Sequence, residues 1–364
     1  MKIKGFKSFL FLIGFCFSSV MVQGQIRYVE SSELHIGGKV KHAGNTFHRL
    51  DMVVYQDLPA NIKKLMTNSS GMYLSFQSNS SKIVAEWCTS SAKTYPNLPG
   101  IAFEGLDLYV KENGKWIYAG VGRPTHQNCQ TQTLVENMEN SEKEFLLYLP
   151  LYDEITSFKL GIDSSATYQV IKPFSTDVAF YGTSIVQGAS ASRPGLNYTS
   201  KLSRNLGIEA INWGVSGSAR MEKSVSKMIG EMDLDVLVLD CIPNCSPEHI
   251  DERTKDFILE IREKHPNLPI LAIAGAPFES GNFNTKVKEN MRLRNLYFEK
   301  HIKDLMREDS NLYFLSGEGL LGEDHEGTID GTHPNDIGFE RMIQKIEPEL
   351  KNILLKYNLI EKFN

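Results

Sequence analysis

The spacing of apolar residues changes near residue 172, and this change limits the folds open to the chain. From about residue 26 to 164, short stretches such as GMYLSFQS and KIVAEWC alternate apolar and polar residues between turns rich in Asn, Gly, Ser and Pro. Alternation of period two predicts antiparallel strands with one buried face. After residue 172, apolar runs such as VAFY and DVLVLD alternate with longer segments of helical period. Strands buried on both faces and joined by helices predict a parallel α/β sheet.

The first 24 residues have the pattern of a cleavable secretory signal. Three lysines precede the apolar stretch Phe9–Phe17, and small residues follow near Gly24. That stretch is too short to span a bilayer, and no later segment is long and apolar enough to do so. Cys16 follows Phe15 instead of a small residue, which argues against a lipid anchor. We therefore expect a mature chain that begins near Gln25 and is secreted or periplasmic.

The remaining length has room for two domains of ordinary size. We expect an antiparallel β-sandwich domain over residues 25–172 and an α/β domain over residues 173–364. Within the first, the sequence KENGK at Lys111–Lys115 predicts a tight hairpin, because Asn-Gly supplies the positive φ angles that such turns need. Within the second, Ser246 followed by proline and glutamate predicts the start of a helix.

Charge and cysteine content exclude several classes of protein. A net charge of −5 with 41% hydrophobic residues and no basic stripe describes a globular protein that does not bind nucleic acid. Four cysteines follow the predicted signal: Cys88, Cys129, Cys241 and Cys245. Their redox state stays open, and the last two form either a local bridge or a pair of buried thiols. The sequence does not determine the oligomeric state.

Polar residues follow the predicted parallel strands at the ends where ligands bind in open α/β sheets. The first strand ends before Ser184, and the second runs into a glycine-rich stretch containing Gly217. The third leads to Asn244, and the last leads through a loop to Asp330 and His333. Because the carboxyl ends of parallel strands share one edge of a sheet, we expect these five residues to lie together.

Together these residue types fit acyl transfer. A serine hydroxyl is a weak nucleophile unless an imidazole accepts its proton, and a carboxylate must hold that imidazole in the right tautomer. We therefore predict Ser184 as nucleophile, His333 as base and Asp330 as its orienting acid. The backbone N–H groups of Ser184 and Gly217 and the side chain of Asn244 would form the oxyanion hole, where a side chain at position 217 would crowd the oxygen. Activity should then fall at acidic pH, and a flat profile between about pH 5 and 8 would contradict this mechanism.

Local structural roles are the alternative for each of these residues. Ser184 could cap the helix after the first strand, Gly217 could be a turn glycine, Asn244 a loop cap, and His333 a residue at a helix start. Ser216 lies in a stretch that begins like the nucleophile turn of α/β-hydrolases, but a serine stands where the closing glycine is needed.

A metal site is the remaining alternative at this edge. His325 together with Asp330 would have to supply ligands, but no supporting ligand cluster is visible in the sequence. We expect neither a metal ion nor an organic cofactor.

The ordered set of Ser184, Gly217, Asn244 and His333 resembles the SGNH/GDSL esterase superfamily. GTSIVQGASASRPG and DGTHPNDIGF look like a bacterial branch with an N-terminal β-domain that carries a Gly-x-Asp-Leu-Tyr motif, matched here by Gly105–Tyr109. The resemblance implies a three-layer, flavodoxin-like SGNH hydrolase domain behind the β-sandwich. Thr183 stands where many relatives have the Asp of Gly-Asp-Ser. Within the motif, a structural turn and a packed aromatic ring are the expected roles of its Asp and Tyr.

By the same resemblance, the chain would be a secreted serine esterase that removes acetyl groups from carbohydrates, with a small-molecule or polysaccharide ester as its substrate. A lipid or aryl esterase is the nearest alternative, and a glycan-binding protein with a vestigial site is another. Trp87, Trp116 and Tyr118 are candidates for a sugar-binding platform, although a place in the buried core is the other expectation for them.

Overall fold

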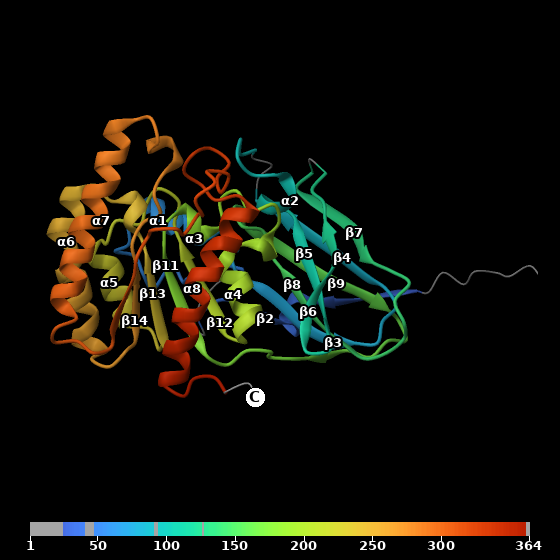
Figure 1. Cartoon of the computed structure of the whole chain (residues 1–364). Coiled ribbons are helices and arrows are strands. Elements are labelled where there is room, and N and C mark those ends of the chain that lie inside the picture. The colour runs from blue at the N-terminus through green and yellow to red at the C-terminus, as the bar shows by residue number, and fades with distance from the viewer. Residues whose placement is uncertain (1–24, 41–46, 91–93, 126, 362–364) are drawn as a thin grey trace, which may run out of the picture.

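The computed structural model describes residues 25–40, 47–90, 94–125 and 127–361. The secretory signal predicted for residues 1–24 lies outside the described residues. Figure 1 shows an antiparallel β region beside a region in which helices surround a sheet. Among the described residues, no helix combines the length and the apolar character needed to cross a bilayer.

The first half of the chain forms two antiparallel sheets that pack face to face. One is 4-stranded with the order β1-β9-β4-β7, and the other is 6-stranded with the order β10-β3-β8-β5-β6, where β2 pairs with β3. The strands are β1 (Ile26–Glu30), β2 (His35–Gly37), β3 (Tyr73–Ser78), β4 (Ile83–Thr89), β5 (Leu106–Glu112), β6 (Lys115–Gly122), β7 (Cys129–Val135), β8 (Lys143–Tyr148), β9 (Ile155–Asp163) and β10 (Gln169–Val170). Fully buried side chains from both sheets, among them Phe76, Phe145, Trp87 and Leu160, fill the space between them. The predicted β-sandwich is thus confirmed.

Two local features of the sandwich bear on the sequence analysis. The predicted hairpin joins β5 to β6, and Asn113 and Gly114 have φ angles of 50° and 78°. Cys88 and Cys129 lie opposite each other on β4 and β7 and form a disulfide. The sequence had left this pairing open, because a covalent bond between two strands depends on their register.

The second half forms a 5-stranded parallel sheet of order β12-β11-β13-β14-β15. Its strands are β11 (Asp177–Gly182), β12 (Glu209–Gly214), β13 (Val236–Asp240), β14 (Ile270–Ile273) and β15 (Leu312–Leu315). Counted along the chain this is the 2-1-3-4-5 order of flavodoxin-like folds, as predicted. The helices in the described part of the chain are α1 (Ala60–Met66), α2 (Gly100–Phe103), α3 (Ser184–Gln187), α4 (Tyr198–Leu206), α5 (Lys223–Gly230), α6 (Pro247–Lys264), α7 (Thr285–Leu305) and α8 (Asp336–Lys356).

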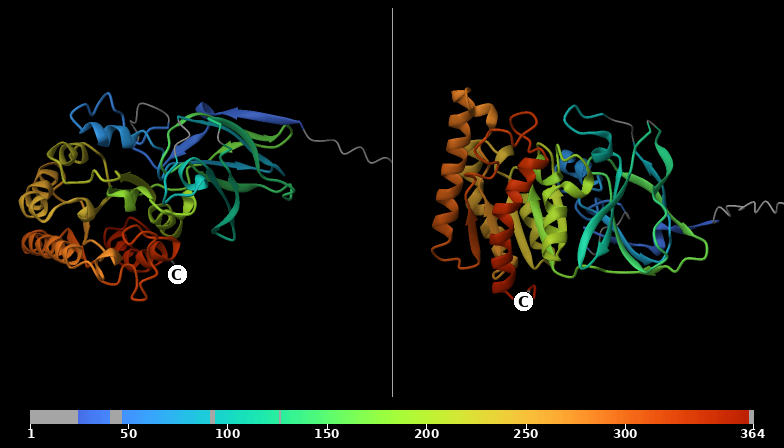
Figure 2. Two further views of the ribbon diagram at one scale, coloured as in Figure 1. Left: turned by 90° about the horizontal axis from the view of Figure 1, so that it is seen from above. Right: turned by 45° about the vertical axis from the view of Figure 1, so that its right-hand side comes forward.

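Both faces of the parallel sheet are buried, and successive residues of β11 point to opposite faces. Val178 and Phe180 join a core with residues of α4 and α8. Ala179 and Tyr181 join a second core with residues of α5, α6 and α7. Figure 2 shows these helices on the two sides of the sheet. The continuous apolar runs of the sequence therefore reflect burial on two faces.

Parts of the first half of the chain also pack into these two cores. Leu50 and Ile62 belong to the same buried cluster as Trp213 of β12. Phe103 and Tyr152 belong to the cluster on the other face. The β region is thus joined to the α/β region by shared apolar cores, which matters for the site described next.

Candidate active site

The turn that follows β11 presents Ser184 at the carboxyl edge of the parallel sheet. Thr183 caps α3, because its Oγ1 accepts a hydrogen bond from the Ile185 N–H at 3.2 Å. The capping role considered for Ser184 is therefore wrong, and its hydroxyl is free for other contacts. Glycine is required at position 182, since a Cβ there would lie 2.2 Å from the carbonyl oxygen of Asp240 on β13.

Ser184, His333 and Asp330 form a continuous chain of hydrogen bonds. Ser184 Oγ lies 2.9 Å from His333 Nε2, and His333 Nδ1 lies 2.7 Å from Asp330 Oδ2. The other carboxylate oxygen, Oδ1, accepts hydrogen bonds from the backbone N–H groups of Thr332 and His333 at 3.0 and 2.8 Å. The loop after β15 therefore holds acid and imidazole in one turn, and the fold brings that turn to the serine.

The electrostatics of Asp330 fix the tautomer of His333. Partial burial raises the pKa of Asp330, but the hydrogen bonds from His333 and Thr332 and the interaction with the imidazole outweigh burial, so its pKa lies below the usual value. An ionised carboxylate only accepts hydrogen bonds, so the proton on the ring lies on Nδ1. Nε2 is then the atom that accepts the hydrogen bond donated by the Ser184 hydroxyl.

The loops that carry Gly217 and Asn244 flank the serine. They follow β12 and β13, the two strands that pair with β11 on either side. Asn244 Oδ1 accepts a hydrogen bond from the Ala219 N–H at 3.3 Å, which ties the two loops together. Its amide nitrogen and the Gly217 N–H have no acceptor within the described part of the chain, so both are available as donors.

The backbone gives a further physical reason for glycine at position 217. A Cβ at this position would meet no atom within 4 Å in the structure without substrate, so crowding by protein atoms is not the constraint. The backbone instead adopts φ = 69°, in the left-handed region that glycine enters without strain.

Two alternatives from the sequence are not supported by the geometry. The Ser216 N–H donates to Gln187 Oε1 at 3.0 Å, and the serine bonded to His333 is Ser184. The His325 ring lies 2.8 Å from Glu279 and does not pair with Asp330. Among the described residues, no group of three or more His, Cys, Asp or Glu side chains is placed to hold a metal ion.

The two cysteines beside Asn244 are free thiols. Cys241 and Cys245 are both buried and do not form a disulfide. Burial raises the pKa of Cys241 well above its usual value and that of Cys245 to about 12, so both thiols stay protonated at neutral pH.

Asp107 joins the two regions of the molecule. It lies within β5, so the turn expected for it is wrong, although the pairing of β5 with β6 shifts register between Leu108 and Tyr109. Its buried carboxylate binds Arg193 Nη1 at 2.6 Å and accepts the Gly195 N–H at 2.8 Å. Burial raises the pKa of Asp107 above its usual value although Arg193 opposes the shift. The Tyr109 hydroxyl accepts a hydrogen bond from the same guanidinium. The Gly105–Tyr109 motif therefore connects the first half of the chain to the loop after α3.

Sequence reasoning missed three buried residues near the serine. Gln187 is the last residue of α3, and Arg49 and Tyr152 come from the first half of the chain. The Tyr152 hydroxyl donates to the carbonyl oxygen of Ser184 at 3.4 Å, and burial raises the pKa of this phenol. A polar residue in the short buried turn after Ser184 was a signal for Gln187. No pattern in the sequence marks the other two.

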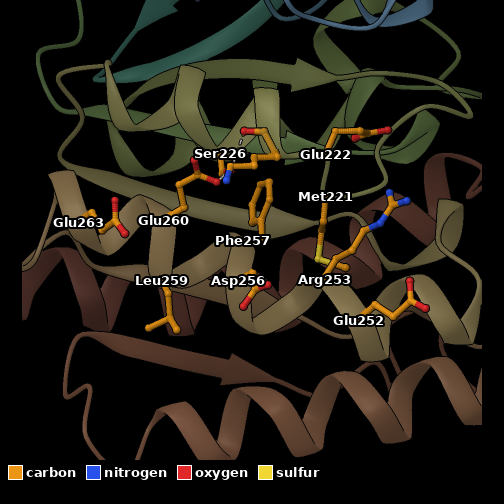
Figure 3. Close-up of a pocket in the computed structure, with 11 residues that line it drawn as sticks. Met221, Glu222, Ser226, Glu252, Arg253, Asp256, Phe257, Leu259, Glu260 and Glu263 are labelled. Atoms are coloured by element: carbon orange, nitrogen blue, oxygen red, sulfur yellow. Dashed lines mark hydrogen bonds between the residues drawn. The ribbon is translucent and has the colours of Figure 1, made fainter.

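A groove between α5 and α6 lies apart from this arrangement. Figure 3 shows its lining, in which acidic side chains such as Glu222, Glu252 and Glu263 surround Phe257. Ser226 Oγ donates to Glu260 Oε2 at 2.8 Å inside it. None of the five predicted site residues lines this groove.

Comparison with known proteins agrees with this architecture. Residues 175–351 match the model of the GDSL-like lipase/acylhydrolase family, and residues 26–168 match the model of the N-terminus of SGNH-hydrolase-type esterases. The crystal structure of a GDSL-like lipase from Bacteroides ovatus ATCC 8483, a provisional designation, has 46% sequence identity and a TM-score of 0.88. That comparison covers 91% of this chain and 98% of the other. A search of curated proteins found no match.

More distant solved structures share the fold. The salicylyl-acyltransferase SsfX3 from a tetracycline biosynthetic pathway has 18% identity and a TM-score of 0.73, with 90% of this chain and 97% of that chain covered. An acetyl xylan esterase, Est2A, from the rumen bacterium Butyrivibrio proteoclasticus has 13% identity and a TM-score of 0.57, with 91% and 99% covered. At such identities the likeness concerns the fold alone.

Fold and comparisons together define an SGNH-type hydrolase whose α/β sheet follows a β-sandwich. The chain belongs to the GDSL-like lipase/acylhydrolase family and carries the N-terminal domain of SGNH-type esterases, as the sequence resemblance predicted. Its function is accordingly that of an esterase or related acyl hydrolase.

Proposed function

We propose that Ser184 is the nucleophile of this hydrolase, with His333 as general base and Asp330 as the residue that orients it. The observation that carries this proposal is the unbroken hydrogen-bond chain from Ser184 Oγ through the imidazole to the carboxylate, at 2.9 and 2.7 Å. A hydroxyl, an imidazole and an ionised carboxylate in this order are what nucleophilic catalysis by serine requires.

The reaction follows from these positions. Ser184 Oγ attacks the ester carbonyl carbon while His333 Nε2 takes its proton, and the N–H groups of Ser184 and Gly217 with the Asn244 amide hold the oxyanion. When the tetrahedral intermediate collapses, the bond to the alcohol breaks and His333 returns the proton to the leaving oxygen. Water then attacks the acyl-enzyme with His333 again as base, and the carboxylic acid and the free serine are released.

We propose carbohydrate O-acetyl esters as the substrates. Support comes from the fold shared with an acetyl xylan esterase and with a family two carbohydrate esterase from Clostridium thermocellum in complex with cellohexaose. The site needs no cofactor for this chemistry, because proton transfer and charge stabilisation are supplied by its own side chains and backbone.

A fully exposed aromatic ring beside the acid–base loop also favours an extended sugar substrate. Phe283 is 100% exposed, and it follows η4 (Glu279–Gly281), in which the Ser280 N–H donates to the Gly331 carbonyl oxygen at 3.0 Å. An open ring at the rim of a site offers a flat apolar surface to a sugar. It is a better candidate for a platform than Trp87, which is fully buried and donates to the Glu104 carbonyl oxygen.

The other two aromatic candidates, Trp116 and Tyr118, lie on β6 of the sandwich. Arg193 covers the Tyr118 ring at 4.5 Å, so one face of that ring is occupied. Trp116 is half-buried against Phe174.

We also propose that the protein is exported through the signal at residues 1–24 to a periplasm or the medium, and that residues 25–172 and 173–364 are its two domains. The disulfide between Cys88 and Cys129 supports an oxidising compartment, since such bonds rarely persist in the cytosol.

Acetate release from a panel of acetylated polysaccharides tests the proposal, with Ser184→Ala as the control. We expect release by the native chain and a loss of at least about 10⁴-fold in the variant, because no other group replaces the nucleophile. A variant that retains activity within tenfold of the native chain would refute the role of Ser184.

The two alternatives give different results in a second assay. Rapid hydrolysis of p-nitrophenyl acetate relative to the octanoate supports the deacetylase, whereas a preference for octanoate favours the lipid esterase. Binding of glycans without hydrolysis of either ester would favour a vestigial site.

A further inference from the structure

Gln187 connects the first half of the chain to the loop that carries Gly217. Its side chain is fully buried, and all its hydrogen-bonding groups are directed at protein atoms from three segments. Oε1 accepts the Ser216 N–H at 3.0 Å, while Nε2 donates to Asn68 Oδ1 at 3.2 Å and to the Leu151 carbonyl oxygen at 3.3 Å. A carboxamide is needed here, because it combines one acceptor with two donors in one plane.

The bond to Ser216 holds the peptide directly before the one that supplies the proposed oxyanion donor. Ser216 directly precedes Gly217, and a Cβ on Gly217 would meet nothing within 4 Å, so packing around that glycine does not hold the loop. A glycine with φ = 69° and open surroundings can change its backbone angles at little cost. The direction of the Gly217 N–H therefore depends on the hydrogen bonds of its neighbours. On the C-terminal side these are the Ser218 N–H to the Val215 carbonyl oxygen at 2.9 Å and the Ala219 N–H to Asn244 at 3.3 Å. On the N-terminal side the Ser216 N–H is held by Gln187.

Arg49 fixes the strand that leads into the same loop. It is fully buried, and its Nη1 donates to the carbonyl oxygens of Asn212 and Gly214 at 2.9 and 2.8 Å. Its Nε donates to the carbonyl oxygen of Asn68, the residue whose side chain binds Gln187. Burial lowers the pKa of Arg49 to about 9, so the guanidinium stays charged at neutral pH. Asn68 thus links Arg49, which binds its carbonyl oxygen, to Gln187, which binds its side chain.

We propose that Gln187 is a positioning residue that sets the oxyanion donor of Gly217, and that the first half of the chain contributes to catalysis through it and through Arg49. This inference rests on the proposed esterase function and extends it. The β region then acts on the rate of the chemical step with any ester, in addition to whatever it does for substrate binding.

Gln187→Met tests the proposal, since it keeps the length of the side chain and removes the three hydrogen bonds. With p-nitrophenyl acetate we expect kcat to fall by about 10- to 100-fold, less than for complete loss of one oxyanion donor, and KM to stay within about twofold. An effect confined to kcat identifies an interaction that matters in the transition state.

Ser70→Ala is the matched control. Ser70 is as fully buried as Gln187, and its Oγ donates to the backbone carbonyl oxygen of Gln187 at 2.6 Å. The substitution removes a hydrogen bond between the first half of the chain and α3, and it leaves the bond between Gln187 and Ser216 in place. We expect a lower melting temperature, as in the first variant, with kcat within about twofold of the native value.

Asn68→Ala keeps the test valid should Gln187→Met fail to fold. Asn68 is only half-buried, and losing its side chain removes one of the two acceptors of Gln187. The expected result is a fall in kcat of a few-fold, about 3 to 10, at constant KM. A native kcat in folded Gln187→Met and in Asn68→Ala, or an equal fall in kcat in Ser70→Ala, would overturn the proposal.

Amide hydrogen exchange separates this inference from the proposed function. We expect the Ser216 amide to exchange at least about 10-fold faster in Gln187→Met and at the native rate in Ser70→Ala. Unchanged exchange at Ser216 in Gln187→Met overturns the role of Gln187. Absence of hydrolysis that depends on Ser184 in the native chain would instead refute the esterase, and the exchange rates would still decide whether Gln187 holds the loop.

Discussion

Two sets of hydrogen bonds support the candidate site, and they differ in range and in exposure. Asp330 and His333 are three residues apart in a loop where their side chains are 39% and 23% exposed. Arg49 and Gln187 are fully buried, and their bonds include two, from Arg49 to Asn212 and from Gln187 to Asn68, that join residues more than 100 positions apart. Reactive groups therefore come from short local motifs, whereas their alignment comes from contacts between distant parts of the chain.

Two carboxylates near the serine differ in the same way. Hydrogen bonds and the imidazole lower the pKa of Asp330 although burial opposes them. Complete burial raises the pKa of Asp240 to about 6 although the Tyr198 hydroxyl, 3.0 Å away, opposes the shift. The exposed acid is ionised at neutral pH, as its proposed role requires, and the buried acid makes stability depend on pH.

Among the variants that compare the two sets of hydrogen bonds, the largest effect is expected from Asp330→Asn. Loss of the charge removes the partner of the imidazolium and the constraint on the tautomer, so kcat should fall by about 10³–10⁴-fold. Because the pKa of Asp330 lies below its usual value, the carboxylate is ionised across pH 5–8, and the variant lacks this charge throughout that range. Ester hydrolysis from pH 5 to 8 measures the fall in kcat.

Asp324→Asn is the control for this variant. Asp324 lies in the same segment of the chain, is 51% exposed and pairs with Arg341, so its loss should leave kcat unchanged. A fall in kcat of less than 10-fold in Asp330→Asn, or an equal fall in Asp324→Asn, would contradict the proposed role of Asp330 in orienting His333.

Arg49→Met tests the buried set. Its loss leaves buried carbonyl oxygens without donors, and we expect the free energy of unfolding to fall by about 3–5 kcal/mol. Urea unfolding followed by circular dichroism measures the change. The exposed Arg307, which pairs with Asp304 at 3.3 Å, provides the comparison, and Arg307→Met should change stability by less than about 0.5 kcal/mol. Equal losses in the two variants would show that burial of Arg49 does not matter.

The smallest effect is expected from Asp240→Asn and appears only as pH changes. Since the folded chain holds the Asp240 proton up to about pH 6 and an unfolded carboxyl releases it near 3.8, protonation favours the folded state between these values. Stability from this group is therefore full below about pH 4 and is lost as pH rises through 6, by about 3 kcal/mol in total.

Asp240→Asn should not lose stability as the pH rises, because the asparagine side chain does not titrate and still accepts a hydrogen bond from the Tyr198 hydroxyl. Relative to the native chain it should gain stability from pH 4 to 7, as followed by urea unfolding at each pH. A constant difference between the two chains over that range would contradict the pKa of the buried acid.

Much of the fold and of the candidate site could be predicted from the sequence. Alternation before residue 172 and buried runs after it predicted the sandwich and the parallel sheet, because strand periodicity follows burial. Ser184, Asp330 and His333 were predicted to lie together, and they do. Their roles in catalysis stay predictions until the variants are measured, as do the domain boundaries and the secretory signal.

Contacts between distant segments could not be predicted. The disulfide of Cys88 depends on the register of two strands, and the thiol state of Cys241 depends on burial in the assembled core. Gln187 and Arg49 carry no local signal of their partners, since a polar residue in an apolar stretch does not specify which distant backbone groups it will satisfy.

By itself, the sequence determined which elements form and which reactive groups stand at the strand ends, because periodicity and short motifs act within a few residues. Only the tertiary structure decided which residues hold the loop of Gly217 and how each carboxylate titrates. Both depend on burial and on hydrogen bonds between segments far apart in the chain, and those exist only after the two regions have packed together.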